Sequence, residues 1–313
     1  MPVISVILPA YNAEQTIEES IQSIVSQTFI DWELIIINDG STDNTKTKIL
    51  SFIDSRIKYV ENDGNKGLIY TLNRGIDLAT GKYIARMDAD DICYPERFEK
   101  QVAFMEEHPE VIVCGAQIEY FGTKKSGYRK IKLYTSDTEM KEQLAINTCF
   151  AHPSVMMRTE VIKKNNIKYN YSYKNAEDYK IWIDLMKFGK FANLSSPLLK
   201  YRVSDTQITQ NYNSTTSLSE RRCRFDYLKL YTSEEFAKEI SDNGVHIQTI
   251  KKFKKLFTST AVLKNLYLSL NSYTLKEVGY YLFSLDFLRL GPLHNAMFLK
   301  RFIGEANPIY KSL

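Results

Sequence analysis

The sequence is poor in cysteine and in long apolar runs, and each shortage excludes a class of protein. Its four cysteines lie far apart in 313 residues, without the paired spacing of a zinc site or the density of a disulfide framework. They are Cys93, Cys114, Cys149 and Cys223. No uncharged apolar stretch reaches the ~18 residues that a membrane-spanning helix needs. The N-terminal segment has no basic region before its short apolar run, which is typical of a strand and not of a signal peptide. We therefore expect a cytoplasmic protein.

The sequence also lacks internal repeats and low-complexity tracts. Hydrophobic residues make up 44% and charged residues 25% of the chain, which excludes disordered and collagen-like classes. The formal net charge of +4 is spread unevenly: residues 214–313 hold 15 basic and 9 acidic side chains, so the rest of the chain has a balance of −2. A slightly acidic body suits a cation-dependent site, and the C-terminal region is basic.

The first 122 residues alternate between apolar, β-branched runs and helical periodicity. Predicted strands are Val3–Leu8, Glu33–Ile37, Ile57–Val60, Tyr83–Met87 and Val111–Ala116. The intervening segments place apolar residues at helical spacing, and Asn12 is a candidate N-cap of the first helix. Short connections between alternating strands and helices predict an α/β fold with a mainly parallel sheet and helices on both faces. Ligands of such sheets bind at the carboxyl ends of the strands.

The rest of the chain is less regular. Between Gly122 and Gln210 we expect a helix around Glu139–Ile146, a strand at Ser154–Met157 and an amphipathic helix at Glu177–Phe188. From Ser214 onward the pattern is helical, aromatic and basic. The expected domains are therefore residues 1–213 and a helical C-terminal region, residues 214–313.

Polar residues follow three of the predicted strands. The first strand ends in Pro9-Ala10-Tyr11-Asn12, and the second leads into Asn38-Asp39-Gly40. The fourth leads into Asp88-Ala89-Asp90-Asp91, where clustered carboxylates repel one another unless a cation sits among them. Such hard oxygen ligands suit Mg²⁺ or Mn²⁺. The alternatives are a solvated acidic turn, and, for Asp39, ordinary Asp-Gly turn chemistry instead of a carboxylate that binds a base N–H.

A further acidic pair, Glu177-Asp178, opens the amphipathic helix that follows Asn175. The pair could complement the helix dipole beneath an Asn175 cap, or one member could act as a general base toward a hydroxyl group.

Together these stretches resemble glycosyltransferase family 2, which has the GT-A fold. The resemblance rests on the order of several motifs over residues 1–210. They are Val3–Asn12, Trp32–Thr45, Asn65–Leu68, Gly81–Asp91 and Glu177-Asp178. Each motif is weak alone, and the ordered set is specific.

The resemblance implies a role for each matching residue. Pro9, Ala10 and Tyr11 would line the nucleoside pocket, and Asp39 would accept from N3 of uracil or thymine. Asp88 and Asp90 would form a DxD motif, with Asp90 on a divalent metal (Mn²⁺ or Mg²⁺) and Asp88 near the ribose or the metal. Lys66 and Arg86 would lie near the donor phosphates. Asp178 would be the catalytic base.

The resemblance further implies inverting transfer of a hexose or N-acetylhexosamine from a UDP-sugar, or a dTDP-sugar, to a saccharide acceptor. We expect the acceptor to be lipid-linked and the process to be assembly of a cell-surface polysaccharide. Two other stretches resemble the family less specifically. His152 lies in a stretch that is near the sugar and acceptor in many members. Ser204, in Tyr201-Arg202-Val203-Ser204, stands where the family often has histidine, which argues against a third protein ligand to the metal and against a role for Arg202 at the diphosphate.

The basic C-terminal region has two main interpretations. Lys251-Lys252-Phe253-Lys254-Lys255 opens a stretch in which basic and aromatic residues interleave, as in helices that lie on the inner face of a cell membrane. The alternative is an ordinary helical region that packs on the sheet. Nucleic acid is disfavoured because the pI of 8.6 is modest and no reading motif appears. For the whole chain, a nucleotidyltransferase and a non-catalytic sugar-nucleotide-binding or membrane scaffold protein remain as alternatives.

Overall fold

The computed structural model describes residues 1–122, 133–145, 147–203, 214–231, 233–234 and 237–238. The chain divides into two compact units, one made of Met1–Lys141 and Thr148–Cys223, the other of Glu142–Asn147 and Arg224–Leu313. The sheet and the site described below belong to the first unit. The domain boundary expected after residue 213 lies outside the described residues and stays a prediction.

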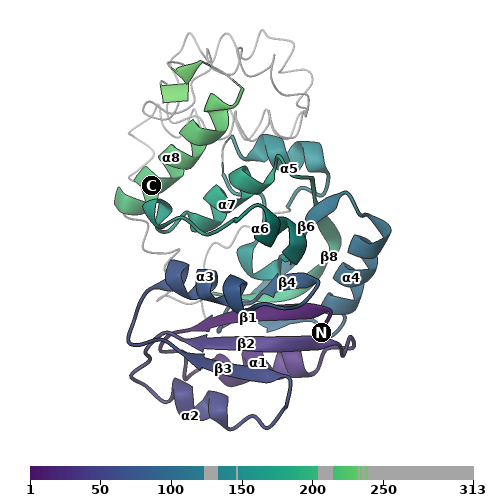
Figure 1. The fold of residues 1–313 in the computed structure, drawn as a ribbon, viewed down its shortest axis with the longest axis vertical. Coiled ribbons are helices and arrows are strands. Elements are labelled where there is room, and N and C mark those ends of the chain that lie inside the picture. The colour runs from purple at the N-terminus through teal and green to yellow at the C-terminus, as the bar shows by residue number, and fades with distance from the viewer. Residues whose placement is uncertain (123–132, 146, 204–213, 232, 235–236, 239–313) are drawn as a thin grey trace, which may run out of the picture. The chain divides into compact units, whose positions relative to one another are not determined.

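Strands and helices alternate along the first unit, as Figure 1 shows. The strands are β1 (Ile4–Ala10), β2 (Trp32–Asn38), β3 (Ile57–Glu61), β4 (Tyr83–Arg86), β5 (Ile92–Cys93), β6 (Val111–Gly122), β7 (Met156–Arg158) and β8 (Lys190–Val203). The α-helices are α1 (Ile17–Val25), α2 (Thr45–Leu50), α3 (Leu68–Leu78), α4 (Arg97–Glu107), α5 (Asp137–Gln143), α6 (Thr159–Lys164), α7 (Glu177–Leu185) and α8 (Ser214–Lys229). Two 3₁₀ turns, η1 (His152–Ser154) and η2 (Tyr171–Tyr173), complete the set.

The strands form one sheet in the order β3-β2-β1-β4-β7-β6-β8-β5. β1 pairs in parallel with β2 and β4, β2 with β3, and β6 with β8. β7 is antiparallel to both β4 and β6, and β5 is antiparallel to β8. The predicted α/β fold with a mostly parallel sheet is thus confirmed. In the middle of the sheet, β7 runs antiparallel to both of its neighbours.

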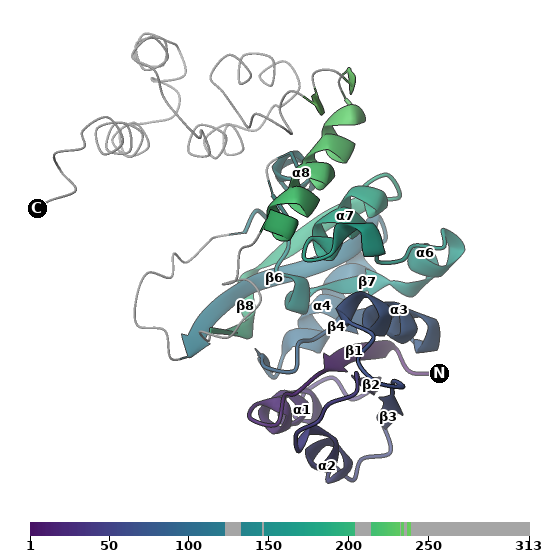
Figure 2. The ribbon, with the colours of Figure 1, turned by 90° about the vertical axis from the view of Figure 1, so that its left-hand side faces the viewer.

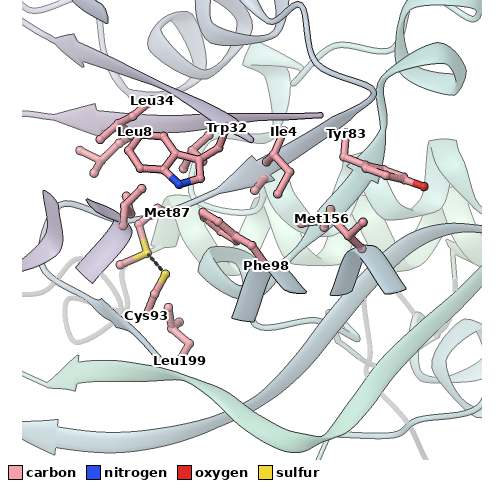
Figure 3. Packing of buried hydrophobic residues seen from close by; sticks show 14 of the residues in the cluster. Ile4, Leu8, Trp32, Leu34, Tyr83, Met87, Cys93, Phe98, Met156 and Leu199 are labelled. Atoms are coloured by element: carbon pink, nitrogen blue, oxygen red, sulfur yellow. Dashed lines mark hydrogen bonds between the residues drawn. The ribbon is translucent and has the colours of Figure 1, made fainter. Parts of the chain in front are cut away.

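The apolar residues of β1 alternate between two packed faces, so helices cover the sheet on both sides (Figure 2). Ile4 and Leu8 join the main core with Phe98 of α4, and Figure 3 shows these side chains beside Trp32 and Met87. On the opposite face Ile7 meets α3 at Gly75, where a Cβ atom would come within 2.4 Å of the isoleucine. α3 therefore lies closer to the sheet than any larger residue at position 75 would allow.

The region between residues 122 and 210 is more regular than the sequence indicates, because it contains the long strand β8. The pairing of β8 with β6 jumps from Leu194 opposite Ala116 to Pro197 opposite Gln117. Exposed residues Ser195 and Ser196 occupy this bulge. An inserted polar pair breaks the alternation of apolar residues, so the strand was missed.

Two expected helix caps are wrong. Thr16, not Asn12, is the N-cap residue of α1. Asn12 has φ 48°, and its side-chain oxygen accepts from the Thr42 amide at 2.9 Å. The N-cap of α7 is Ala176, and Asn175 before it has φ 66°. Asparagine tolerates this left-handed conformation, so both residues serve turns that precede the helices.

The C-terminal region begins with a helix, as expected, in α8. The basic and aromatic stretch from Lys251 onward lies outside the described residues, so its membrane-surface and packed alternatives stay predictions. Among the helices that the structure describes, none combines the length and the apolar composition needed to cross a membrane.

Candidate functional site

The register of the parallel strands brings the predicted site residues to one edge of the sheet. Ala10 of β1 lies beside Asn38 of β2, which in turn lies beside Glu61 of β3. β4 ends at Arg86, opposite Ile7 of β1. The segments that follow β1, β2 and β4 therefore leave the sheet at its carboxyl edge.

Asp39 is buried and organises the loop that follows β3. Its Oδ1 accepts from the Asn62 amide nitrogen Nδ2 at 2.6 Å and from the Lys66 backbone amide at 2.9 Å. Its Oδ2 accepts from the backbone amide of Gly67, the N-cap of α3, at 2.8 Å. A carboxylate offers about four lone-pair sites, so one direction at Oδ2 remains for a ligand. Asp39 is thus an anchor of its neighbouring loop as well as a candidate acceptor for a base.

The other residues predicted around the nucleotide differ in accessibility. Tyr11 is half exposed, Pro9 is partly exposed, and Ala10 is buried with its carbonyl accepting from the Asp39 amide at 2.8 Å. Lys66 is exposed, and its backbone rather than its ammonium group meets Asp39. Tyr11 and Lys66 are therefore the accessible side chains of this group.

Three carboxylates gather after β4. Asp88, Asp90 and Asp91 each place an oxygen within 4.8 Å of the others. Asp91 is fully buried, and its Oδ2 has no hydrogen-bond partner among the described residues. Burial raises the pKa of Asp91 well above its usual range, and the charges of Asp88 and Asp90 act in the same direction. The cluster can hold a divalent cation, which would offset this repulsion.

Arg86 and Arg202 hold the acidic segment in place. The guanidinium group of Arg86, which is nearly buried, faces both carboxylate oxygens of Asp88. The Arg202 backbone amide donates to Asp91 at 2.8 Å, and its Nε donates to the Asp90 carbonyl at 2.7 Å. The end of β8 therefore holds the Asp90 backbone and the Asp91 carboxylate. Arg202 thus supports the segment that contains Asp90 and Asp91.

The reversed strand β7 brings His152 to the same edge. Because β7 is antiparallel to β4, the residues that precede it lie beside the carboxyl end of β4, where the Arg86 amide donates to the Val155 carbonyl at 3.0 Å. His152 Nε2 lies 2.8 Å from the Tyr169 hydroxyl oxygen. Burial lowers the pKa of His152 well below its usual range, and the Arg86 charge adds to this effect, so the ring is neutral.

Glu177 and Asp178 begin α7, as predicted. Burial raises the pKa of Glu177 to about 7, and the adjacent Asp178 charge adds to the rise. Burial also raises the pKa of Asp178, against hydrogen bonds from the Tyr179 amide and from Thr148, whose hydroxyl lies 3.4 Å from Oδ2. A carboxylate with a raised pKa is a stronger base than an ordinary aspartate, so Asp178 is suited to remove a proton.

Comparison with known proteins identifies the chain. The model of "Glycosyl transferase family 2" matches residues 5–165. The chain belongs to this family. An "Uncharacterized glycosyltransferase" of Haemophilus influenzae is 33% identical over 99% of both chains. A UDP-Glc:alpha-D-GlcNAc-diphosphoundecaprenol beta-1,3-glucosyltransferase, WfgD of Escherichia coli, is 29% identical over 67% of this chain and 80% of its own.

Solved structures show the same fold. S. aureus TarS 1-349 in complex with UDP-GlcNAc superposes with a TM-score of 0.62 at 19% identity, covering 88% of this chain and 83% of that one. A mannosyltransferase from Pyrobaculum calidifontis, in complex with GDP-Man and Mn²⁺, gives a TM-score of 0.53 at 14% identity, covering 95% and 85%. The GT-A fold expected from the family resemblance is thus confirmed.

The structure also adds residues to the site that the family motifs do not mark. Tyr169 contacts His152, and Asn62 donates a hydrogen bond to the carboxylate of Asp39. Asp91 was visible in the sequence as the last acid of the motif, but its burial was not. No sequence signal marks Tyr169, because its position depends on a loop packing on α3. The roles of Asp39, Asp88, Asp90 and Asp178 within family 2 chemistry stay predictions.

Proposed function

We propose that the protein is an inverting, metal-dependent transferase that moves a hexose or N-acetylhexosamine from a UDP-sugar, or a dTDP-sugar, to a saccharide acceptor. The observation that carries the proposal is the convergence of the Asp88–Asp90–Asp91 cluster with Glu177–Asp178 in a member of family 2. Charges of Arg86, Asp88, Glu177 and Asp178 all act on the Tyr169 hydroxyl, so the two acidic groups lie within electrostatic range of one buried side chain.

The residues after β4 fit a divalent metal. They supply carboxylate oxygens at the spacing of a shared cation, and the buried Asp91 Oδ2 lacks a partner within the described chain. Asp90 and Asp88 would hold the metal, which supplies positive charge to a departing diphosphate when it is bound. The complex of the P. calidifontis mannosyltransferase with Mn²⁺ supports this assignment.

The chain's own residues account for the remaining steps. Asp39 accepts a hydrogen bond from the base, Tyr11 flanks the nucleoside, and the Arg86 guanidinium group steadies Asp88 beside the phosphates. Asp178 removes the proton of the acceptor hydroxyl as its oxygen bonds to the anomeric carbon, and the bond from that carbon to the diphosphate breaks. A base and a leaving group on opposite faces of the sugar invert the anomeric centre, by the geometry of inverting glycosidases.

The printed names of two relatives support a proposal for the acceptor. WfgD of E. coli is named for transfer to a diphosphoundecaprenol-linked sugar, and an Erwinia amylovora relative, 31% identical over 66% of this chain, for amylovoran biosynthesis. We infer a lipid-linked saccharide acceptor in cell-surface polysaccharide assembly, with the protein at the inner face of the membrane.

A donor screen tests the proposal. The full chain is incubated with a panel of UDP-, dTDP- and GDP-sugars, with Mn²⁺ or with chelator, and release of the nucleoside diphosphate is measured. We expect Mn²⁺-dependent release from a UDP- or dTDP-sugar. Release of pyrophosphate from a nucleoside triphosphate and a sugar phosphate would instead support the nucleotidyltransferase. Tight binding without release in the presence of a saccharide acceptor would support the non-catalytic alternative.

A further inference from the structure

Tyr169 and His152 form a hydrogen-bonded pair within electrostatic range of Arg86. Their Nε2-to-hydroxyl distance is 2.8 Å, and their ring centroids are 5.5 Å apart. The charge of Arg86 acts on both side chains, and those of Asp178, Glu177 and Asp88 act on Tyr169. Tyr169 is therefore the member of the pair that lies within electrostatic range of both acidic groups.

A side chain of α3 holds the backbone of Tyr169 in place. Asn73 of α3 donates from Nδ2 to the Tyr169 carbonyl at 2.9 Å, and its Oδ1 accepts from the Tyr169 amide at 2.8 Å. The tyrosine is 2% exposed. Two hydrogen bonds with the Asn73 amide group hold the Tyr169 backbone, and burial restricts the ring that carries the hydroxyl group.

The His152 ring is held by aromatic neighbours and keeps one nitrogen available. It contacts Trp182 edge-on, with centroids 5.9 Å apart, and Trp182 lies one helical turn after Asp178 on α7. His152 is half-buried, and Nδ1 has no hydrogen-bond partner among the described residues. Nδ1 is thus the ring atom that remains for a hydrogen bond to a ligand.

The chemistry of the pair decides which group donates. Burial lowers the pKa of His152 and raises that of Tyr169, so both groups are neutral. A phenol is a better donor than a neutral imidazole, and an imidazole nitrogen is a better acceptor than a phenol oxygen. The Tyr169 hydroxyl therefore donates to Nε2, and the ring proton lies on Nδ1.

We propose that Tyr169 is a positioning residue that fixes His152 as the Nδ1–H tautomer, so that the ring presents a neutral hydrogen-bond donor to an oxygen of the bound donor sugar. The inference rests on the proposed function, because the ligand is the sugar of a sugar nucleotide. A neutral donor can bind a hydroxyl oxygen without adding charge beside Arg86.

Nitrogen-15 spectra of the histidines test the tautomer. The chain has four histidines, and the His152 signals are assigned by their loss in His152→Asn. We expect Nδ1 to be protonated and Nε2 to be an acceptor in the unliganded protein, and Tyr169→Phe to abolish this preference. A protonated Nε2 in the wild-type protein, or unchanged His152 signals in Tyr169→Phe, would overturn the proposal.

Kinetics test the consequence for the sugar. In Tyr169→Phe we expect kcat/KM for the donor to fall about tenfold, the equivalent of roughly one hydrogen bond, with UDP affinity by calorimetry unchanged. Tyr83→Phe is the matched control, because Tyr83 is also buried and its hydroxyl bonds Glu106 at 2.7 Å. An equal loss of UDP affinity in Tyr169→Phe would show a merely structural role. The spectra decide the tautomer even if no donor is turned over, so failure of the proposed function is distinguishable.

Discussion

Arg86 and Asp88 face each other as a two-pronged ion pair, with both guanidinium-to-carboxylate distances at 2.5 Å. The arginine ends β4 and the aspartate begins the acidic segment, so one ion pair links the sheet to the carboxylate cluster. The Arg86 side chain is 5% exposed and that of Asp88 is 27% exposed. The buried partner therefore orients the accessible one.

Lysine at position 86 should weaken transfer although it keeps the charge. An ammonium group cannot bind both carboxylate oxygens as a fork, so Asp88 loses its orientation. We expect donor turnover by Arg86→Lys to fall about tenfold or more, measured as diphosphate release. Arg56→Lys is the control, because Arg56 also contacts both carboxylate oxygens of an aspartate, Asp54, from Nε at 3.0 Å and from Nη2 at 2.7 Å. Equal effects of both variants would count against a special role of the pair.

Asp90→Ala should remove metal-dependent turnover. Loss of one carboxylate reduces both the negative charge of the cluster and its number of oxygen ligands. Mn²⁺ affinity in the presence of UDP should therefore fall at least about tenfold. Calorimetry measures the affinity, and exposed Asp31→Ala is the control. Full activity of the wild-type protein in chelator would refute the metal assignment.

Asp178→Asn should separate donor binding from transfer. The amide is similar in size but cannot take a proton, so transfer should fall by roughly 10² or more while UDP binding by calorimetry is kept. Asp184→Asn on the same helix, where Asp184 bonds Lys180 at 2.5 Å, should leave transfer intact. Retained transfer in Asp178→Asn would exclude Asp178 as the base.

Glu177 should make the protein less stable as pH rises. Its pKa is about 7 when folded, against an ordinary value of 4.5, so the folded state binds the proton more tightly. The free energy of unfolding should therefore fall between pH 4.5 and 7, by up to roughly 3 kcal/mol. Urea titrations at pH 4, 6 and 8 should show that Glu177→Gln lacks this loss. The control variant Glu160→Gln, at an exposed position, should behave like the wild type. If the free energy of unfolding changed with pH to the same extent in both variants, the prediction would be contradicted.

Glu33 should have the opposite effect in acid. Burial alone would raise the pKa of Glu33, but hydrogen bonds from Lys58, Ser5 and Thr80 outweigh it and lower the pKa to about 2. Its contribution is present above pH 4.5 and is lost as pH falls through 2. Glu33→Gln should lower the free energy of unfolding at pH 7 by roughly 2 kcal/mol. Urea unfolding measures it, and the difference from the wild type should shrink toward pH 2.

The sequence predicted β1 to β4, the first half of β6 and the helices between them because their periodicities are clean, but it missed the two-residue strand β5. β1 and β2 are mostly apolar, with Ser5 and Glu33 as interior polar residues. The acids follow strands whose carboxyl ends lie at one edge of the sheet. Because the bulge at Ser195 and Ser196 interrupts the apolar pattern, β8 was not predicted, and neither was the contact of Arg202 with Asp91. The pairing of Tyr169 with His152 depends on Asn73, almost a hundred residues earlier. Such distant contacts leave no local periodicity to detect.

Arg202 reaches the acidic segment from a strand that lies beyond residue 165, where the family model ends. A shortened protein cut after β7 would contain Asp88, Asp90 and Asp91 but would lack the two hydrogen bonds that Arg202 donates to the Asp90 carbonyl and the Asp91 carboxylate. Minimal versions of this enzyme should therefore extend at least through Val203, and domain swaps within the family should transfer β8 together with the segment that follows β4.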